Sequence, residues 1–107
     1  MELKQYTIIL VNLDPAIGSE IKKTRPCLII SPNEMNKYLQ TIVVAPITNS
    51  SKPYPTRVAI QSQKTKGWVV LDQIRSIDKQ RVVKTFISIS EKEINQIKAL
   101  IKEIYVD

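Results

Sequence analysis

The residues best suited to chemistry gather in one short segment, GSEIKKTRPCLII, which begins at Gly18. The segment places a carboxylate, Glu20, shortly before a guanidinium, Arg25, with Lys22 and Lys23 between them. A guanidinium presents a fork of donors that matches phosphate oxygens, and it keeps its charge at any working pH. The segment is therefore suited to a phosphate group, although an ordinary surface arginine at the start of a strand is the alternative.

The composition narrows the possible chemistry. The chain has no histidine, which excludes the usual general base, the Ser-His dyad and most zinc sites. The formal net charge of +6 favours a polyanionic partner, nucleic acid first, although solubility alone also produces basic proteins. The single cysteine, Cys27, cannot form an internal disulfide, and its place in CLII predicts a buried thiol.

The length and hydropathy pattern predict one folded domain over residues 1–107. A hydrophobic content of 43% and a charged content of 24% are typical of globular proteins. The longest apolar run, TIILV at residues 7–11, is far shorter than the roughly 20 residues that cross a bilayer. The N-terminus MELKQY lacks the pattern of a signal peptide. We therefore expect a cytoplasmic protein with no membrane contact.

Short β-branched segments separated by turn formers predict a β-rich chain. The predicted strands cover residues 7–13, 27–31, 41–47, 56–60, 67–74, 76–77 and 82–89. A polar loop is expected at residues 16–24, a turn or short helix at 31–39, and a turn at 78–81. Pro46 suggests a strand end or an edge position. Several closely spaced strands predict a small barrel or sandwich.

The C-terminal segment has a different pattern. Ser90 and Glu93 form a capping box, which marks the start of a helix. Apolar residues then follow at helical spacing, namely Ile94, Ile97, Leu100, Ile101 and Ile104. One amphipathic helix is therefore expected to close the domain, which gives an α+β fold class.

Three blocks of the sequence together resemble the MazF/PemK toxins. They are NLDPAIGSEIKKTRPCLIISP, VVAPIT and LDQIRSIDKQR, and they span most of the chain from Asn12 to Arg81. The resemblance implies a homodimeric, small SH3-like β-barrel (the CcdB/PemK-like fold) with a C-terminal helix. It also implies an endoribonuclease that cuts single-stranded RNA at short sequences without a metal or other cofactor. A cognate MazE-like antitoxin would cover the RNA groove and neutralise the toxin.

The resemblance also implies roles for three residues. Arg25 would stabilise the charge on phosphorus while the ribose 2′-hydroxyl attacks, which gives a 2′,3′-cyclic phosphate and a 5′-hydroxyl. Thr48, at the end of APIT, would donate a hydrogen bond to a phosphoryl oxygen. Glu20 would serve either as the general base or as a salt-bridge partner that orients Arg25.

Further residues are expected to bind RNA, and Asp72 is one of them. It is interpreted as a possible base or as a structural carboxylate, because the chain has Val70 where one branch of the family has an arginine. Gln73 suits base edges, and Tyr54 suits base stacking. Trp68 is a further candidate for base stacking, although a place in the core or at a dimer interface is favoured for it. The complete predicted RNA-binding set is Gly18, Ser19, Lys22, Lys23, Lys52, Tyr54, Arg57, Asp72, Gln73 and Lys79.

Two other functions are compatible with the sequence. One is a non-catalytic toxin on the same fold that binds DNA gyrase, as in the CcdB branch. The other is an RNA-binding module that has lost cleavage. The combination of Glu20, Arg25 and Thr48 favours the enzyme over both.

Overall fold

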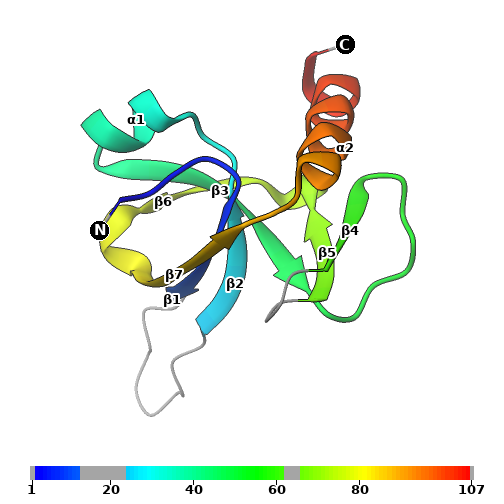
Figure 1. Cartoon of the computed structure of the whole chain (residues 1–107), viewed down its shortest axis with the longest axis horizontal. Coiled ribbons are helices and arrows are strands. Elements are labelled where there is room, and N and C mark those ends of the chain that lie inside the picture. Colours follow the sequence, from blue (N-terminus) through cyan, green and yellow to red (C-terminus); the bar gives the residue numbers. More distant parts are fainter. Residues whose placement is uncertain (1, 13–23, 62–65, 107) are drawn as a thin grey trace.

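Seven antiparallel strands curl into a half-open barrel in the computed structural model, which describes residues 2–12, 24–61 and 66–106 (Figure 1). The strands are β1 (Thr7–Asn12), β2 (Thr24–Ile29), β3 (Thr41–Thr48), β4 (Arg57–Gln61), β5 (Lys66–Val70), β6 (Arg75–Asp78) and β7 (Val82–Ser88). Their order is β4-β5-β3-β2-β1-β7, and β6 pairs with β3. The α+β class predicted from the sequence is confirmed.

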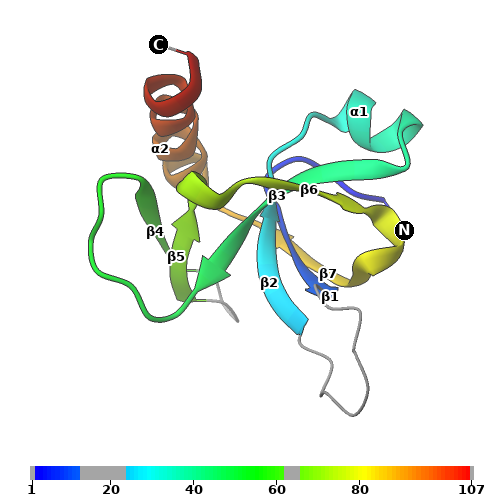
Figure 2. The same cartoon turned by 180° about the vertical axis from the view of Figure 1, so that it is seen from behind.

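Strand β3 joins the two halves of the sheet because it changes partner along one edge. Its first residues, Thr41 to Val44, pair with β6, whereas Ile47 and Thr48 pair with β5. The other edge pairs with β2. Pro46 faces Cys27 on β2, and no pair with β5 or β6 is found for it in the described part of the chain. A proline without an amide hydrogen is tolerated at such a gap. Figure 2 shows β3 running through both halves.

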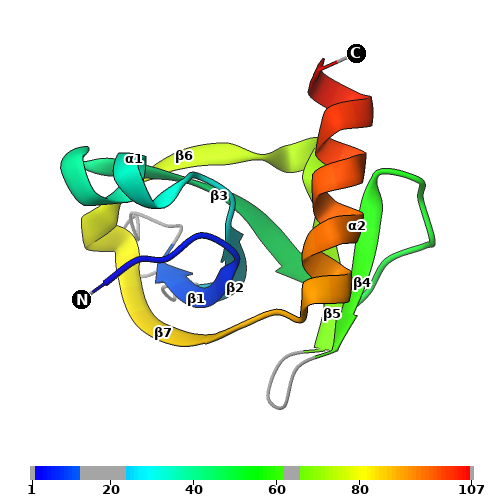
Figure 3. The same cartoon turned by 45° about the horizontal axis from the view of Figure 1, so that its top comes forward.

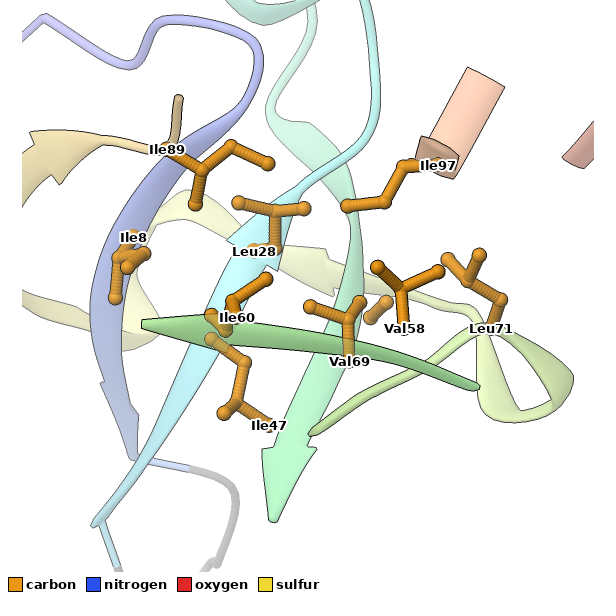
Figure 4. Close-up of a cluster of buried hydrophobic side chains, with 10 residues drawn as sticks. Ile8, Leu28, Ile47, Val58, Ile60, Val69, Leu71, Ile89 and Ile97 are labelled. Carbon is orange, nitrogen blue, oxygen red and sulfur yellow. The ribbon is translucent and has the colours of Figure 1, made fainter. Parts of the chain in front are cut away.

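Alternating residues of the sheet supply two hydrophobic clusters. Ile8 and Leu28 belong to the larger cluster, in which Ile97 from the C-terminal helix also packs. Figure 4 shows these side chains converging between the sheet and the helix. Ile9, Cys27 and neighbouring residues form the second cluster on the opposite face. The central strands are therefore buried on both faces.

Two helices complete the fold, α1 (Asn33–Tyr38) and α2 (Glu91–Ile101). Helix α2 stands beside β4 and β5 and continues into a π-helical turn, Lys102–Val106 (Figure 3). The predicted capping box is confirmed: the Glu93 amide donates to Ser90 Oγ at 3.2 Å, and the Ser90 amide donates to Glu93 Oε1 at 3.1 Å. Glu93 Oε2 accepts from the Gln61 amide at 2.8 Å, which ties α2 to β4.

Some predicted boundaries differ from the structure. Strand β2 starts at Thr24, earlier than predicted, because Arg25 pairs with Val11 and Pro26 pairs with Leu10 of β1. The predicted strand 67–74 was too long, since residues after Val70 turn into the 3₁₀ segment Leu71–Gln73. The predicted turn at 78–81 contains a second 3₁₀ segment, Lys79–Arg81.

The predicted burial of Cys27 is confirmed. Its side chain is 1% exposed, and burial raises the pKa of the thiol to about 11 against the opposing charges of Arg75 and Arg25. In the described ranges, none of the helices has the length and hydropathy of a membrane-spanning segment.

Gly67 permits a close approach of β5 to β3, and its replacement tests that contact. A Cβ atom at this position would lie 2.5 Å from the carbonyl oxygen of Thr48 and 3.1 Å from Ile47 Cγ2. We expect Gly67→Ala to lower the free energy of unfolding by about 1–3 kcal/mol in urea denaturation, because a backbone atom must shift. The control Lys66→Ala, at an exposed neighbouring position, should stay within about 0.5 kcal/mol of the wild type. Equal stability of both variants would contradict the close approach.

Candidate active site

The strand register brings Arg25 and Thr48 together. The pairing of β2 with β3 ends with Cys27 opposite Pro46, and the same register continued by two residues would set Arg25 opposite Thr48. Residues opposite each other on antiparallel strands share one face of the sheet. Arg25 and Thr48 line a larger cavity of about 400 Å³ and a smaller cavity of about 200 Å³. The two residues therefore meet at one open end of the sheet.

The Thr48 hydroxyl is held at the mouth of these cavities by a turn. Its Oγ1 donates to the Ser50 carbonyl oxygen at 3.1 Å and accepts from the Ser50 amide at 3.3 Å. The Ser50 residue is exposed. A phosphate oxygen that enters the cavity can take the place of this carbonyl, while the amide of Ser50 still fixes the oxygen of Thr48.

A second guanidinium, that of Arg57, lines the smaller cavity together with Arg25, Thr48 and Gln73. Its Nη1 donates to Ser51 Oγ at 2.7 Å, and its Nε lies 3.4 Å from Asp72 Oδ1. The guanidinium also lies over the Tyr54 ring, 4.8 Å from its centre. These three contacts fix the orientation of Arg57, whose side chain is 17% exposed.

The Asp72 carboxylate holds Arg57 and is held in turn by Thr56, whose Oγ1 donates to Asp72 Oδ1 at 2.9 Å. Burial raises the pKa of Asp72, but this effect is outweighed. The pKa of Asp72 is held below its ordinary value by hydrogen bonds from Thr56, from the backbone amide of Asp72 and from Arg57. The positive charge of Arg57 acts in the same direction. A lower pKa makes a weaker proton acceptor at neutral pH. Of the two predicted roles, the geometry favours the structural one.

The other predicted site residues fall into three groups. Lys52 and Tyr54 lie in the loop after β3 and line a shallow cavity beside Arg57. Lys79 lies instead near Lys37, at the end of β3 opposite Thr48. At roughly 3.3 Å per residue, β3 spans about 23 Å between its two ends. The structure therefore does not bring Lys79 to the site. The remaining predicted residues lie outside the described part of the chain, namely Gly18, Ser19, Glu20, Lys22 and Lys23.

Comparison with known proteins identifies the family. Residues 4–105 match the model of the PemK-like, MazF-like toxins of type II toxin-antitoxin systems. This chain belongs to that family. The match covers β1 to β7 and both helices, so it includes Arg25, Thr48 and the whole Arg57 cluster.

Individual relatives agree with this assignment. The chain is 34% identical over 102 residues to a protein named endoribonuclease MazF from Staphylococcus saprophyticus. The aligned region covers 89% of this chain and 84% of the relative. The fold matches a MazE-MazF structure from Deinococcus radiodurans with a TM-score of 0.86 at 21% identity, over 97% of this chain and 96% of that one. It also matches a mycobacterial endoribonuclease in complex with its cognate antitoxin, with a TM-score of 0.80 at 20% identity, over 94% and 92% of the two chains.

Sequence reasoning missed several residues of this MazF-like site. Ser51 and Thr56 support Arg57 and Asp72, although both stand in a turn-rich segment with no pattern of their own. Asn49 and Lys66 line the larger cavity. Asn49 directly follows Thr48, so its position could have been suspected. Lys66 reaches the cavity only through the pairing of β5 with β3, which the sequence does not display.

The lowered pKa of Asp72 predicts a pH-dependent contribution to stability. The ionised carboxylate stabilises the folded state at a pH above its unfolded pKa of about 3.9, and this contribution is lost as the pH falls through the lower folded pKa. We expect Asp72→Asn to lower the free energy of unfolding at pH 7 by less than about 1 kcal/mol, because the pair is partly exposed. The difference from the wild type should shrink in strong acid.

Urea denaturation at pH 7 and in acid measures this difference. Glu103→Gln is the matched control, since it removes one carboxylate from an exposed position of the C-terminal turn. It should stay within about 0.5 kcal/mol of the wild type. A difference between Asp72→Asn and the wild type that grows in acid would contradict the lowered pKa.

Proposed function

We propose that this chain is a sequence-specific, metal-independent endoribonuclease toxin that cleaves single-stranded RNA, mRNA in the cell. One observation carries the proposal: in a chain of the MazF-like family, Arg25 and Thr48 line the same cavities at the open end of the sheet. The name endoribonuclease MazF of the staphylococcal relative supports the same activity. No observation favours the gyrase-binding alternative.

In this mechanism the 2′-hydroxyl oxygen of the ribose attacks the adjacent phosphorus. A bond forms between this oxygen and phosphorus, and the bond from phosphorus to the 5′-oxygen of the next nucleotide breaks. Arg25 binds the non-bridging oxygens as their negative charge grows, and Thr48 Oγ1 donates to one of them. A guanidinium keeps its proton at working pH, so Arg25 acts by electrostatic stabilisation rather than as an acid. The products carry a 2′,3′-cyclic phosphate and a 5′-hydroxyl.

The proton of the 2′-hydroxyl needs an acceptor. Asp72 is a weak candidate because its Oδ1 accepts from Thr56 and Arg57 and its pKa is lowered. We therefore assign the proton transfer to the Glu20 carboxylate, which lies outside the described residues. The departing 5′-oxygen takes its proton from solvent.

The surrounding residues bind and position the RNA strand. Lys52 and Arg57 contact phosphates, which fixes the position of the strand without reading its sequence. Gln73 lines the smaller cavity, where its amide can bond to a base edge, and Tyr54 offers a half-exposed ring. The segment with Gly18, Ser19, Lys22 and Lys23 is proposed to supply a further RNA contact.

Regulation follows the same family pattern. The protein is proposed to be a homodimer that acts in the cytoplasm, where its RNA substrate lies. A MazE-like antitoxin is proposed to neutralise it by covering the RNA site. The solved MazE-MazF and endoribonuclease-antitoxin structures support this partner class.

Cleavage of a defined single-stranded transcript in EDTA tests the proposal. We expect cuts at a short recurring sequence, with 2′,3′-cyclic phosphate and 5′-hydroxyl ends. Arg25→Ala should lower the rate by about 100-fold or more, as expected for loss of a group that stabilises transition-state charge. Arg25→Lys should restore little of it, because an ammonium lacks the fork of donors.

Lys98→Gln is the control, because it removes one positive charge from an exposed position on α2. It should cleave at the wild-type rate. An intact transcript after prolonged incubation with the wild-type protein would refute the proposed activity. Cleavage by Arg25→Ala at the wild-type rate would refute the mechanism alone.

A further inference from the structure

We propose that Trp68 forms a base-stacking subsite for a nucleotide that flanks the scissile phosphate. This inference rests on the proposed function, because it assumes an RNA strand at Arg25 and Thr48. It favours the base-stacking interpretation of Trp68 over the expected place in the core or at a dimer interface. Trp68 is only half-buried, and neither hydrophobic cluster includes it, so the expectation of a core position is wrong.

The strand register places Trp68 beside the predicted catalytic threonine. Trp68 on β5 is the direct partner of Thr48 on β3. Direct antiparallel partners share a face, and their Cβ atoms lie about 4.5–5.5 Å apart. The register of β2 with β3, continued by two residues beyond Cys27 and Pro46, would set Arg25 on the other side of Thr48, which extends the row to β2. Neighbouring strands are roughly 4.8 Å apart, so Trp68 is about one nucleotide's reach from the phosphate.

Trp68 also borders a groove of about 740 Å³ between the β4-β5 hairpin and the start of α2, which we call the Trp68 groove. Asn49 and Lys66 line both this groove and the larger cavity that holds Arg25. The two spaces therefore adjoin at Asn49 and Lys66. An RNA strand bound at Arg25 can continue past Asn49 and Lys66 onto the indole ring of Trp68.

The charges of the Trp68 groove suit a nucleic-acid backbone. Lys66 and Lys92 are exposed cations on its rim. Glu93 is the acidic residue of the lining, and both its oxygens already accept hydrogen bonds, from Ser90 and from the Gln61 amide. Cationic walls around an aromatic face are the usual elements of a single-strand binding site. Because every base has a π-face, this subsite would add affinity with little sequence preference.

The intrinsic fluorescence of the protein reports this subsite directly, because Trp68 is the only tryptophan of the chain. The probe is a mixed-sequence oligonucleotide of 2′-O-methyl RNA, which lacks the attacking hydroxyl and is not cleaved. We expect saturable quenching with the same dissociation constant that anisotropy of the labelled oligonucleotide gives. If anisotropy shows that the oligonucleotide binds but the Trp68 fluorescence does not change, the inference is overturned. It is also overturned if dilution of the protein alone changes the fluorescence, because that indicates that Trp68 contacts a second copy of the chain.

Variants separate stacking from packing. Trp68→Leu should weaken oligonucleotide binding by about 5- to 150-fold, whereas Trp68→Phe should keep most of the affinity. The salt dependence of binding should not change in either, because no charge is removed. Lys92→Gln should reduce the slope of the logarithm of the binding constant against the logarithm of the salt concentration by about 0.7, as expected for one lost phosphate contact. Equal affinity of the Leu and Phe variants would overturn the subsite.

Tyr38→Ala is the matched control, since it removes a 75% exposed aromatic ring on α1. Its affinity should equal that of the wild type. The proposed function is tested separately by cleavage of natural RNA in EDTA. A wild-type protein that cleaves RNA but shows no fluorescence response refutes the Trp68 subsite alone, whereas one that neither cleaves nor binds refutes both.

Discussion

The pairing of β3 with β2 on one edge and with β5 on the other is the constraint on which the site depends. It pairs Thr48 with Trp68, and the register of β2 with β3, continued beyond Cys27 and Pro46, extends this row toward Arg25. The exchange of partner from β6 to β5 occurs next to Pro46, and Gly67 lets β5 approach the carbonyl of Thr48. The backbone therefore sets the spacing of the chemical groups before any side chain is chosen. The two hydrophobic clusters hold β3 from both faces and make that spacing rigid.

The site also brings positive charges together, and their mutual repulsion must be offset by other groups. Arg25 and Arg57 both line the cavity of about 200 Å³, where two guanidinium groups repel each other. Asp72 offsets the charge of Arg57 and fixes its position, together with Ser51 and the Tyr54 ring. Arg25 has no corresponding carboxylate among the contacts found in the described residues. A phosphate bound between the two arginines would accept hydrogen bonds from both guanidinium groups and offset their repulsion.

The sequence predicted those parts of the fold that depend on local patterns. The capping box at Ser90 and the helical spacing after it located α2 correctly, and β-branched runs located most strands. It could not predict features that depend on register. The start of β2 at Thr24 required the pairing with β1, and the link from Arg57 to Asp72 required the turn after β5 to face the loop before β4.

The candidate site shows the same division. Arg25 and Thr48 were predicted as site residues because they lie in blocks that resemble a family. Lys79 was grouped with them because it lies in such a block too, yet it is at the far end of β3. Distance along the sequence carries little information about distance in a curled sheet. A place in the core or at a dimer interface was favoured for Trp68 for a related reason, since its pairing with Thr48 cannot be read from the sequence.

A double-mutant cycle tests most directly whether Arg25 and Thr48 act on one phosphate. Single-turnover cleavage rates in EDTA would be compared for the wild type, Arg25→Ala, Thr48→Ala and the double variant. Residues that act as a unit are strongly non-additive. We predict that the double variant is hardly slower than the slower single variant. Losses that simply add on the logarithmic scale would contradict a shared site.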